Sequence, residues 1–178
     1  MVTLERLRAD HAGALLDFER ANRAHFARSV PDRGDAFFTP AGFAERLASL
    51  LDEQHGGICH FHVILDAEGR LVGRINLMDV ADGRAELGYR VAERASGRGV
   101  ATAAVAGICR SAATEYGLTA LTAVTTLDNP ASRKVLTRNG FTRTGDALVG
   151  GRPGTAYLRH LDPLPPHTSH TSTAHHRR

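Results

Sequence analysis

The sequence predicts a single α/β (α+β) domain in which helices are interleaved with a mostly antiparallel sheet. The stretch HFHVILDAEGRLVGRINLMDV has two β-rich runs, residues 60–65 and 71–78, on either side of the turn AEG, as a β-hairpin does. Residues 141–161 show a second hairpin pattern, and residues 101–112 place apolar side chains at helical spacing. Strands and helices mixed along a chain of this length indicate one domain with one core.

The composition is that of a globular protein. The chain has 178 residues, of which 42% are hydrophobic and 23% are charged. No apolar run is long enough to cross a bilayer, and the N-terminus MVTLERLRAD lacks the apolar centre of a signal peptide. Cys59 and Cys109 match no metal spacing, so we expect reduced thiols, no metal site and a cytoplasmic protein. A net charge of +3 is too small to predict a specific nucleic-acid partner, and no feature predicts a membrane partner.

The N-terminal third predicts a strand and two helices. The strand spans residues 2–9, and Asp10 is placed to cap the helix that follows it. After a polar segment over residues 24–38, Thr39 and Pro40 open a second helix as its cap and its first residue. Apolar side chains expected to be buried are Ala14, Leu15 and Phe18 in the first helix, and Phe43, Leu47, Leu50 and Leu51 in the second.

A strand and a helix come next. Residues 85–91 alternate as a strand does, with Leu87 and Tyr89 on one side and Glu86 on the other. Gly117 is placed to end the following helix in the left-handed conformation. The apolar stripe of this helix is Ala101, Ala104, Val105, Ile108, Cys109 and Ala112.

The C-terminal part predicts a strand, a short helix and the last hairpin. The strand covers residues 118–125, and the helix begins at Asn129-Pro130 and ends at Asn139-Gly140. The hairpin is expected to turn at Gly150-Gly151 and at Pro153-Gly154. Residues 163–178 have prolines, histidines and small polar residues, so we expect a flexible tail after a domain of residues 1–162.

The joint between the central strand and its helix reads RASGRGVATAAV, with Gly97 and Gly99 on either side of Arg98. Glycine permits close approach to the main chain, and the unpaired N–H groups at a helix start attract anions. A dinucleotide loop is excluded because its third glycine is replaced by Thr102 and no acid follows at the end of the next strand. Two interpretations remain from the loop alone: a pyrophosphate cradle of main-chain amides, or a tight turn that binds nothing.

Three stretches together carry a resemblance to a known family. AELGYRVAERASGRGVATAAV, LTAVTTLDNPASRKVLTRNGF and SVPDRGDAFFTPAGF resemble the GCN5-related N-acetyltransferase (GNAT) superfamily, in particular its ribosomal-protein-alanine N-acetyltransferases. The resemblance covers nearly all of residues 2–161. It implies the GNAT fold, a mixed and mostly antiparallel central sheet of about six to seven strands with about four helices, and a cofactor cleft between the central strands.

The resemblance also implies that the bound anion is the pyrophosphate of coenzyme A, with acetyl-CoA as cosubstrate. The family's loop pattern, Gln/Arg-x-x-Gly-x-Gly/Ala, fits from Arg94 to Gly99 by its letters, or from Ser96 to Ala101 by its distance from strand and helix. We prefer the second register, since it needs no gap. The implied cofactor-binding residues are Tyr89, Arg90, Val91, Ser96, Gly97, Arg98, Gly99, Val100, Ala101, Thr102, Asn129 and Ser132.

The resemblance assigns different contacts to these residues. Tyr89, Arg90 and Val91 are expected to pair with the pantetheine arm as a strand does, and the N–H near Val91 to polarise the acetyl carbonyl. Asn129 is expected to hold the arm, to cap its helix, or to do both.

The acid and the base are the catalytic residues to identify. The resemblance places the Ser132 hydroxyl at the sulfur, and since many relatives have a tyrosine where this chain has Leu136, the acid here is Ser132 or water. Glu86 is the candidate base, acting through water, or it pairs with an arginine. A strong base is not essential, because roughly a tenth of an α-amine is neutral at pH 7.

The predicted function is acetyl-CoA-dependent N-acetylation of a primary amine, by direct transfer through a ternary complex. The preferred acceptor is a protein or peptide N-terminal α-amine. Two alternatives stay open: a small-molecule amine such as a metabolite or antibiotic, and a coenzyme-A-binding module with little turnover. An acidic substrate would suit Arg23, Arg28 and Arg33, unless these are only surface arginines. The prediction leaves room for a homodimer.

Overall fold

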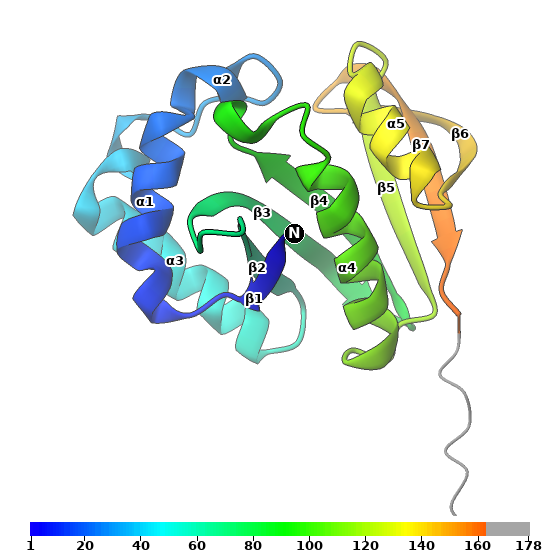
Figure 1. Cartoon of the computed structure of the whole chain (residues 1–178), viewed down its shortest axis with the longest axis horizontal. Helices are drawn as coiled ribbons and strands as arrows, with labels where there is room; N and C mark the ends of the chain where they lie inside the picture. The colour runs from blue at the N-terminus through cyan, green and yellow to red at the C-terminus, as the bar shows by residue number, and fades with distance from the viewer. Residues whose placement is uncertain (163–178) are drawn as a thin grey trace, which may run out of the picture.

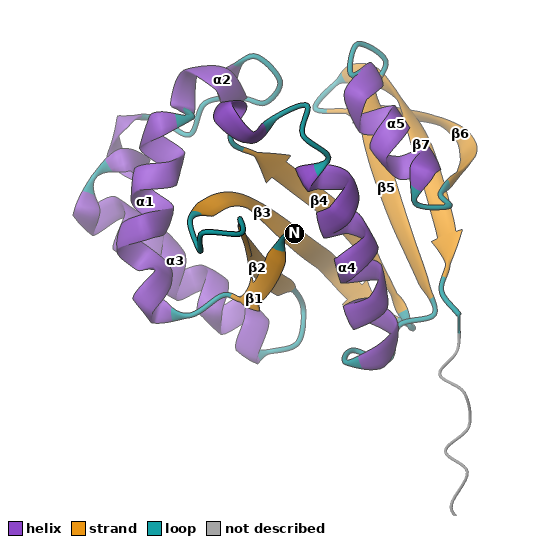
Figure 2. Ribbon diagram, viewed as in Figure 1, coloured by secondary structure: helices purple, strands orange, loops and turns teal. Residues whose placement is uncertain are grey.

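The computed structural model describes residues 1–162, which form seven strands and five α-helices (Figure 1 and Figure 2). The strands are β1 Thr3–Arg6, β2 His60–Leu65, β3 Leu71–Ala81, β4 Arg84–Val91, β5 Ala120–Thr126, β6 Thr142–Val149 and β7 Arg152–His160. The α-helices are α1 Ala12–Ala21, α2 Arg23–Ala27, α3 Pro40–His55, α4 Val100–Thr114 and α5 Pro130–Arg138. Three short 3-10 helices are η1 Ala9–His11, η2 Asp35–Phe38 and η3 Glu93–Ala95. The tail expected at residues 163–178 lies outside the described residues.

All seven strands form one sheet in the order β1-β2-β3-β4-β5-β7-β6. Neighbouring strands are antiparallel except β4 and β5, which are parallel. Helices α1 and α3 pack on one face of β2 and β3, and α4 packs on the other face against β1, β3 and β4. The predicted α/β class and mostly antiparallel sheet are confirmed.

Local sequence signals set the helix ends that flank the site. Thr39 accepts the N–H of Gly42 at the start of α3, with Pro40 as the first helical residue. After α4, Gly117 has φ of +64°, and the N–H of Leu118 donates to the Ala112 carbonyl at 2.8 Å. These two helix ends are formed as the sequence predicts.

The start of α1 differs from the prediction. Asp10 does not cap α1: it lies in η1, and its carboxylate accepts from the Arg8 side chain at 3.0 Å. The helix begins two residues later, at Ala12, and Ala14 faces solvent. Its buried residues are Leu15, Leu16, Phe18 and Glu19. The Asp10 carboxylate therefore binds Arg8 instead of the N–H groups at the start of α1.

Two further segments differ in detail from the prediction. Helix α2, Arg23–Ala27, runs into the polar segment and brings the number of α-helices to five, which is consistent with the expected number of about four. The last hairpin turns only at Gly150-Gly151, whose φ values of +58° and +80° suit a tight turn. Pro153 and Gly154 lie inside β7, opposite Leu148 and Ala147. The ladder between β6 and β7 thus begins immediately after the two glycines.

His62 of β2 is buried beside β1 and the turn that follows α4. The His62 side chain is 5% exposed, and its Nε2 lies 2.7 Å from the Tyr116 hydroxyl. Arg6 donates to the same hydroxyl at 2.9 Å, and the His60 ring stacks on Tyr116 with 3.8 Å between centroids. Burial, and then the charges of Arg6 and His60, lower the pKa of His62 to about 4. His62 is therefore neutral in the folded protein near pH 7.

We expect this histidine to reduce stability in mild acid. The unfolded side chain takes up its proton near pH 6.5, whereas the folded one does so only near pH 4, so the unfolded state binds more protons between these values. The contribution is complete above about pH 6.5 and is lost as the pH falls toward 4, by about 3 kcal/mol at most. Urea unfolding should show a flatter pH profile for His62→Gln than for the wild type. Equal profiles would contradict this account.

Candidate active site

The site is built where the two parallel strands in the centre of the sheet separate (Figure 1). Strands β4 and β5 are paired only as far as Glu86 and Thr122. Beyond these residues β4 continues to Val91, paired with β3 alone, and β5 continues to Thr126, paired with β7 alone. The edges of β4 and β5 that face each other there have no strand partner among residues 1–162.

The unpaired edge of β4 presents main-chain groups at alternate positions. Ala92 donates its N–H to the Val72 carbonyl at 2.7 Å, and Arg90 lies opposite Arg74 in the same antiparallel register. Because hydrogen-bonded pairs alternate in an antiparallel ladder, Arg90 bonds to β3, while Tyr89 and Val91 direct their N–H and C=O groups toward β5. Of the three residues expected along the pantetheine arm, two therefore have free main-chain groups on this edge.

The glycine loop after β4 leads directly into α4. Gly97 and Gly99 have φ of +73° and +77°, the left-handed region that favours glycine. A Cβ at either position would meet nothing within 4 Å, so the main chain is open to another molecule on these sides. Ala103 makes the first helical hydrogen bond, to the Gly99 carbonyl at 3.0 Å, which leaves the N–H groups of residues 100–102 unpaired in the described structure. This geometry is that of an anion cradle.

Two side chains near the loop hydrogen-bond to the protein's own main chain. Ser96 donates its hydroxyl to the Ala92 carbonyl at 3.1 Å, and Arg94 donates to the Leu71 carbonyl at 3.4 Å. These are the first residues of the two registers that fit the predicted loop pattern, so in both registers the first side chain stabilises the loop. Arg98, between the glycines, is exposed.

A hydrogen bond joins β4 to α5 on the face covered by α4. The Tyr89 hydroxyl lies 2.8 Å from Ser132 Oγ. Burial raises the pKa of Tyr89, against the effect of the bond to Ser132, so the phenol keeps its proton near neutral pH. Asn129 accepts the Ser132 N–H at 3.1 Å and caps α5, as the sequence predicts. The contact between Tyr89 and Ser132 was not predicted from the sequence, where Leu136 in place of a tyrosine indicated only that the acid is Ser132 or water.

Glu86 lies on the opposite face of β4 from Tyr89. It is half-buried and is the last residue of β4 paired with β5. The sequence also allowed Glu86 to pair with an arginine. The two arginines on this face of β3 and β4 form their ion pairs with another residue. Arg74 and Arg90 instead lie 3.2 and 3.5 Å from the carboxylate of Glu19.

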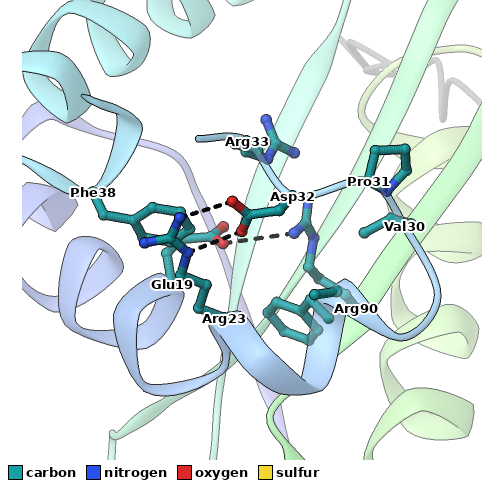
Figure 3. Close-up of a pocket in the computed structure, with 10 residues that line it drawn as sticks. Glu19, Arg23, Val30, Pro31, Asp32, Arg33, Phe38 and Arg90 are labelled. Carbon is teal, nitrogen blue, oxygen red and sulfur yellow. Dashed lines mark hydrogen bonds and ion pairs between the residues drawn. The ribbon is translucent and has the colours of Figure 1, made fainter. Parts of the chain in front are cut away.

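Glu19 is a residue that the sequence analysis missed. Its side chain is 2% exposed and reaches from α1 toward β3 and β4, where Figure 3 shows it joined to Arg90. The available signal was its position, four residues after Leu15 on the buried side of α1. A carboxylate at such a position needs charged partners within the protein.

Neither a metal-binding cluster nor a membrane-spanning helix is present in the part of the chain that the structure describes. Over residues 1–162, no group of three or more His, Cys, Asp or Glu side chains is placed to hold a metal ion. None of the helices in that range has the length and apolar character needed to span a membrane. Cys59 and Cys109 are buried free thiols.

Comparisons with known proteins agree with this geometry. The family model described as acetyltransferase (GNAT) domain matches residues 1–142. No match is found among curated protein sequences. The structure is similar to the ribosomal-protein-S5-alanine acetyltransferase of Vibrio fischeri over 93% of this chain and 96% of that one, with a TM-score of 0.84 and 23% identity.

Two other solved structures are similar over nearly the same region. Mycobacterium smegmatis RimJ, in complex with CoA-disulfide, is 26% identical over 92% of this chain and 84% of its own, with a TM-score of 0.81. Vibrio cholerae spermidine N-acetyltransferase, in complex with CoA and spermine, is 17% identical over 90% of this chain and 95% of its own, with a TM-score of 0.73.

Proposed function

The chain belongs to the acetyltransferase (GNAT) domain family, and from this we propose that it acetylates the N-terminal α-amine of a protein or peptide. The family makes it an N-acetyltransferase that uses acetyl-CoA as cosubstrate and an amine as acceptor. The choice of acceptor rests on the similarity to the ribosomal-protein-S5-alanine acetyltransferase over nearly the whole of both chains. Transfer is direct, within a ternary complex of enzyme, acetyl-CoA and amine.

The residues around the opening fit coenzyme A. The open sides of Gly97 and Gly99 and the unpaired N–H groups of residues 100–102 suit a pyrophosphate, and Arg98 adds positive charge. The groups of Tyr89 and Val91 that face β5 suit the amides of the pantetheine arm. Bound acetyl-CoA supplies the acetyl group as an activated thioester.

Ser132 is the acid in this proposal. The Tyr89 hydroxyl is 2.8 Å from Ser132 Oγ but 3.4 Å from the Ser132 carbonyl, so its single proton is better placed for Oγ. Ser132 then accepts from Tyr89 and keeps its own proton for the departing sulfur. Tyr89 is thus a positioning residue, and the Val91 N–H donates to the acetyl oxygen.

Glu86 is the base, acting through water, on the opposite face of β4. Thr122 lies opposite it, and Val124, two residues further along β5 on the same face, is 38% exposed. This accessible face suits an acceptor that approaches from the side away from α4. The amine nitrogen bonds to the acetyl carbon, and the bond from that carbon to the sulfur breaks. The base removes one proton from the amine, and Ser132 delivers one to the sulfur and regains one from water.

The proposal extends to the domain and its compartment. Residues 1–162 form the whole catalytic domain, since the sheet and the site both lie within them. The two buried free thiols support a reducing compartment, the cytoplasm.

A second candidate function is acetylation of a small amine, favoured by the similarity to spermidine N-acetyltransferase. The test is to measure thiol release from acetyl-CoA with a panel of N-terminal peptides and small polyamines, and to locate the acetyl group by mass spectrometry. We expect acetylation of peptide α-amines. Turnover with polyamines alone would overturn the proposal, and tight coenzyme A binding without any turnover would indicate a binding module.

The cradle can be tested with two glycines at opposite ends of α4. Gly99→Ala adds a methyl group on the open side of the loop, and we expect coenzyme A affinity to fall by about tenfold or more, roughly 1.4 kcal/mol of binding. Gly117→Ala is the matched control, because its φ of +64° imposes similar strain and its Cβ also meets nothing within 4 Å. Calorimetry should find weaker binding only for Gly99→Ala; equal affinities would contradict the cradle.

The acid can be tested at both ends of its hydrogen bond. Ser132→Ala should lower kcat by roughly 100-fold, at the low end for loss of a general acid, with little change in coenzyme A affinity. Tyr89→Phe keeps the ring and should lower kcat by about fivefold, the value of one hydrogen bond. Because Tyr89 acts through Ser132, the double variant should be no slower than Ser132→Ala. Wild-type turnover by Ser132→Ala would show that water is the acid.

A further inference from the structure

A small niche lies beside β4, enclosed by α1, α2 and the loop that follows them (Figure 3). Its lining includes Glu19, Arg23, Phe26, Arg33 and Arg90. The space within it is about 10 Å³, enough for one water-sized group. The niche therefore admits the end of a side chain rather than a bulky ligand.

Two guanidinium groups share one buried carboxylate at the base of this niche. Glu19 lies 3.2 Å from Arg74 and 3.5 Å from Arg90, and the Arg74 and Arg90 side chains are 6% and 24% exposed. The Arg90 guanidinium also lies 5.0 Å from the centre of the Phe26 ring. Buried charges are costly unless they are paired, and Glu19 balances only one of the two cations.

The other side chains of the niche leave one more cation without a carboxylate. Arg23 is held by Asp32 and Asp35, each at 2.8 Å, as Figure 3 shows for Asp32. Arg33 lies 5.0 Å from the centre of the Phe37 ring and has no carboxylate partner within residues 1–162.

Four guanidinium groups thus face three carboxylates around the niche. Burial, and then the neighbouring charge of Arg90, lower the pKa of Arg33. Burial also lowers the pKa of Arg90, against the effect of Glu19. Arg33 is exposed, whereas the Arg90 side chain is only 24% exposed, so one additional carboxylate next to Arg90 would be attracted more strongly than at the open surface.

We propose that this niche receives an oxygen atom of one acceptor carboxylate, between Arg33 and Arg90, and so selects peptides with an acidic side chain close to the N-terminal amine. The inference rests on the proposed peptide acetylation. Arg90 is adjacent in β4 to Val91, the proposed donor to the acetyl oxygen, and neighbouring residues of a strand are about 3.3 Å apart. The acid recognised by Arg90 therefore belongs to the first few residues of the acceptor.

The structure narrows the set of arginines that the sequence suggested for an acidic substrate. Arg23 is already held by two aspartates, and Arg28 lies 3.9 Å from Glu93 outside the niche. Arg33 remains from that set, and Arg90 joins it from β4. The selective pair thus combines one residue of the loop with one residue of the sheet.

The test compares peptides that differ only by Asp or Glu against Asn or Gln at their second and third residues. We expect kcat/KM to favour the acidic peptides by about tenfold, the size of one charge-assisted hydrogen bond. Arg33→Gln should remove this preference and leave turnover of the neutral peptides unchanged. Arg28→Gln removes a charge from the same region outside the niche and should keep the preference.

The outcomes separate this inference from the proposed function. Equal acetylation of acidic and neutral peptides, or an unchanged preference in Arg33→Gln, would refute carboxylate recognition in the niche. Neither result would contradict the proposed acetylation of peptides. If no peptide is acetylated, the proposed function fails. Calorimetry of the same peptides with the coenzyme-A-loaded protein then tests whether the niche binds a carboxylate. Tighter binding of acidic peptides that Arg33→Gln abolishes would support it, and equal binding would refute it.

Discussion

The early end of the parallel pairing between β4 and β5 is the constraint on which the site depends. After Glu86 and Thr122 each strand keeps only its antiparallel partner on the outer side. Main-chain N–H and C=O groups inside a protein need partners, and a strand edge left open in the middle of a sheet is a place where a ligand can supply them. The glycine loop and α4 follow β4 directly, so the same separation leads from this edge to the anion cradle.

Alternation along β4 then places the two proposed catalytic groups, Ser132 and Glu86, on opposite faces of the sheet. Tyr89 points to the side of α4 and α5, where it meets Ser132, whereas Glu86 and Arg90 point to the side of α1. Because side chains alternate with a period of two, one strand carries both sets of groups. In our account the free N–H groups of β4 lie between them, so that the acid and the base act on one acetyl group from opposite sides.

Local signals predicted much of the fold and part of the site. Helix caps, the first hairpin and the glycine-opened start of α4 depend on residues close in sequence, and these were predicted correctly, whereas Arg8 diverted the carboxylate of Asp10. The contacts that were missed join distant residues: Tyr89 and Ser132 are 43 positions apart, and Glu19 and Arg74 are 55 apart. The pattern of apolar and polar residues along the sequence does not indicate where neighbouring strands separate, or which side chains from distant positions come into contact.

Residue-resolved amide exchange, with and without coenzyme A, tests the central claim most directly. The N–H groups of Tyr89 and Val91 face the opening and should gain strong protection when coenzyme A binds, because the arm becomes their partner. The N–H of Arg90 already bonds to β3 and should change little. This alternating response along one strand is what the account predicts. Unchanged exchange at Tyr89 and Val91 in the bound state, or protection confined to other strands, would contradict it.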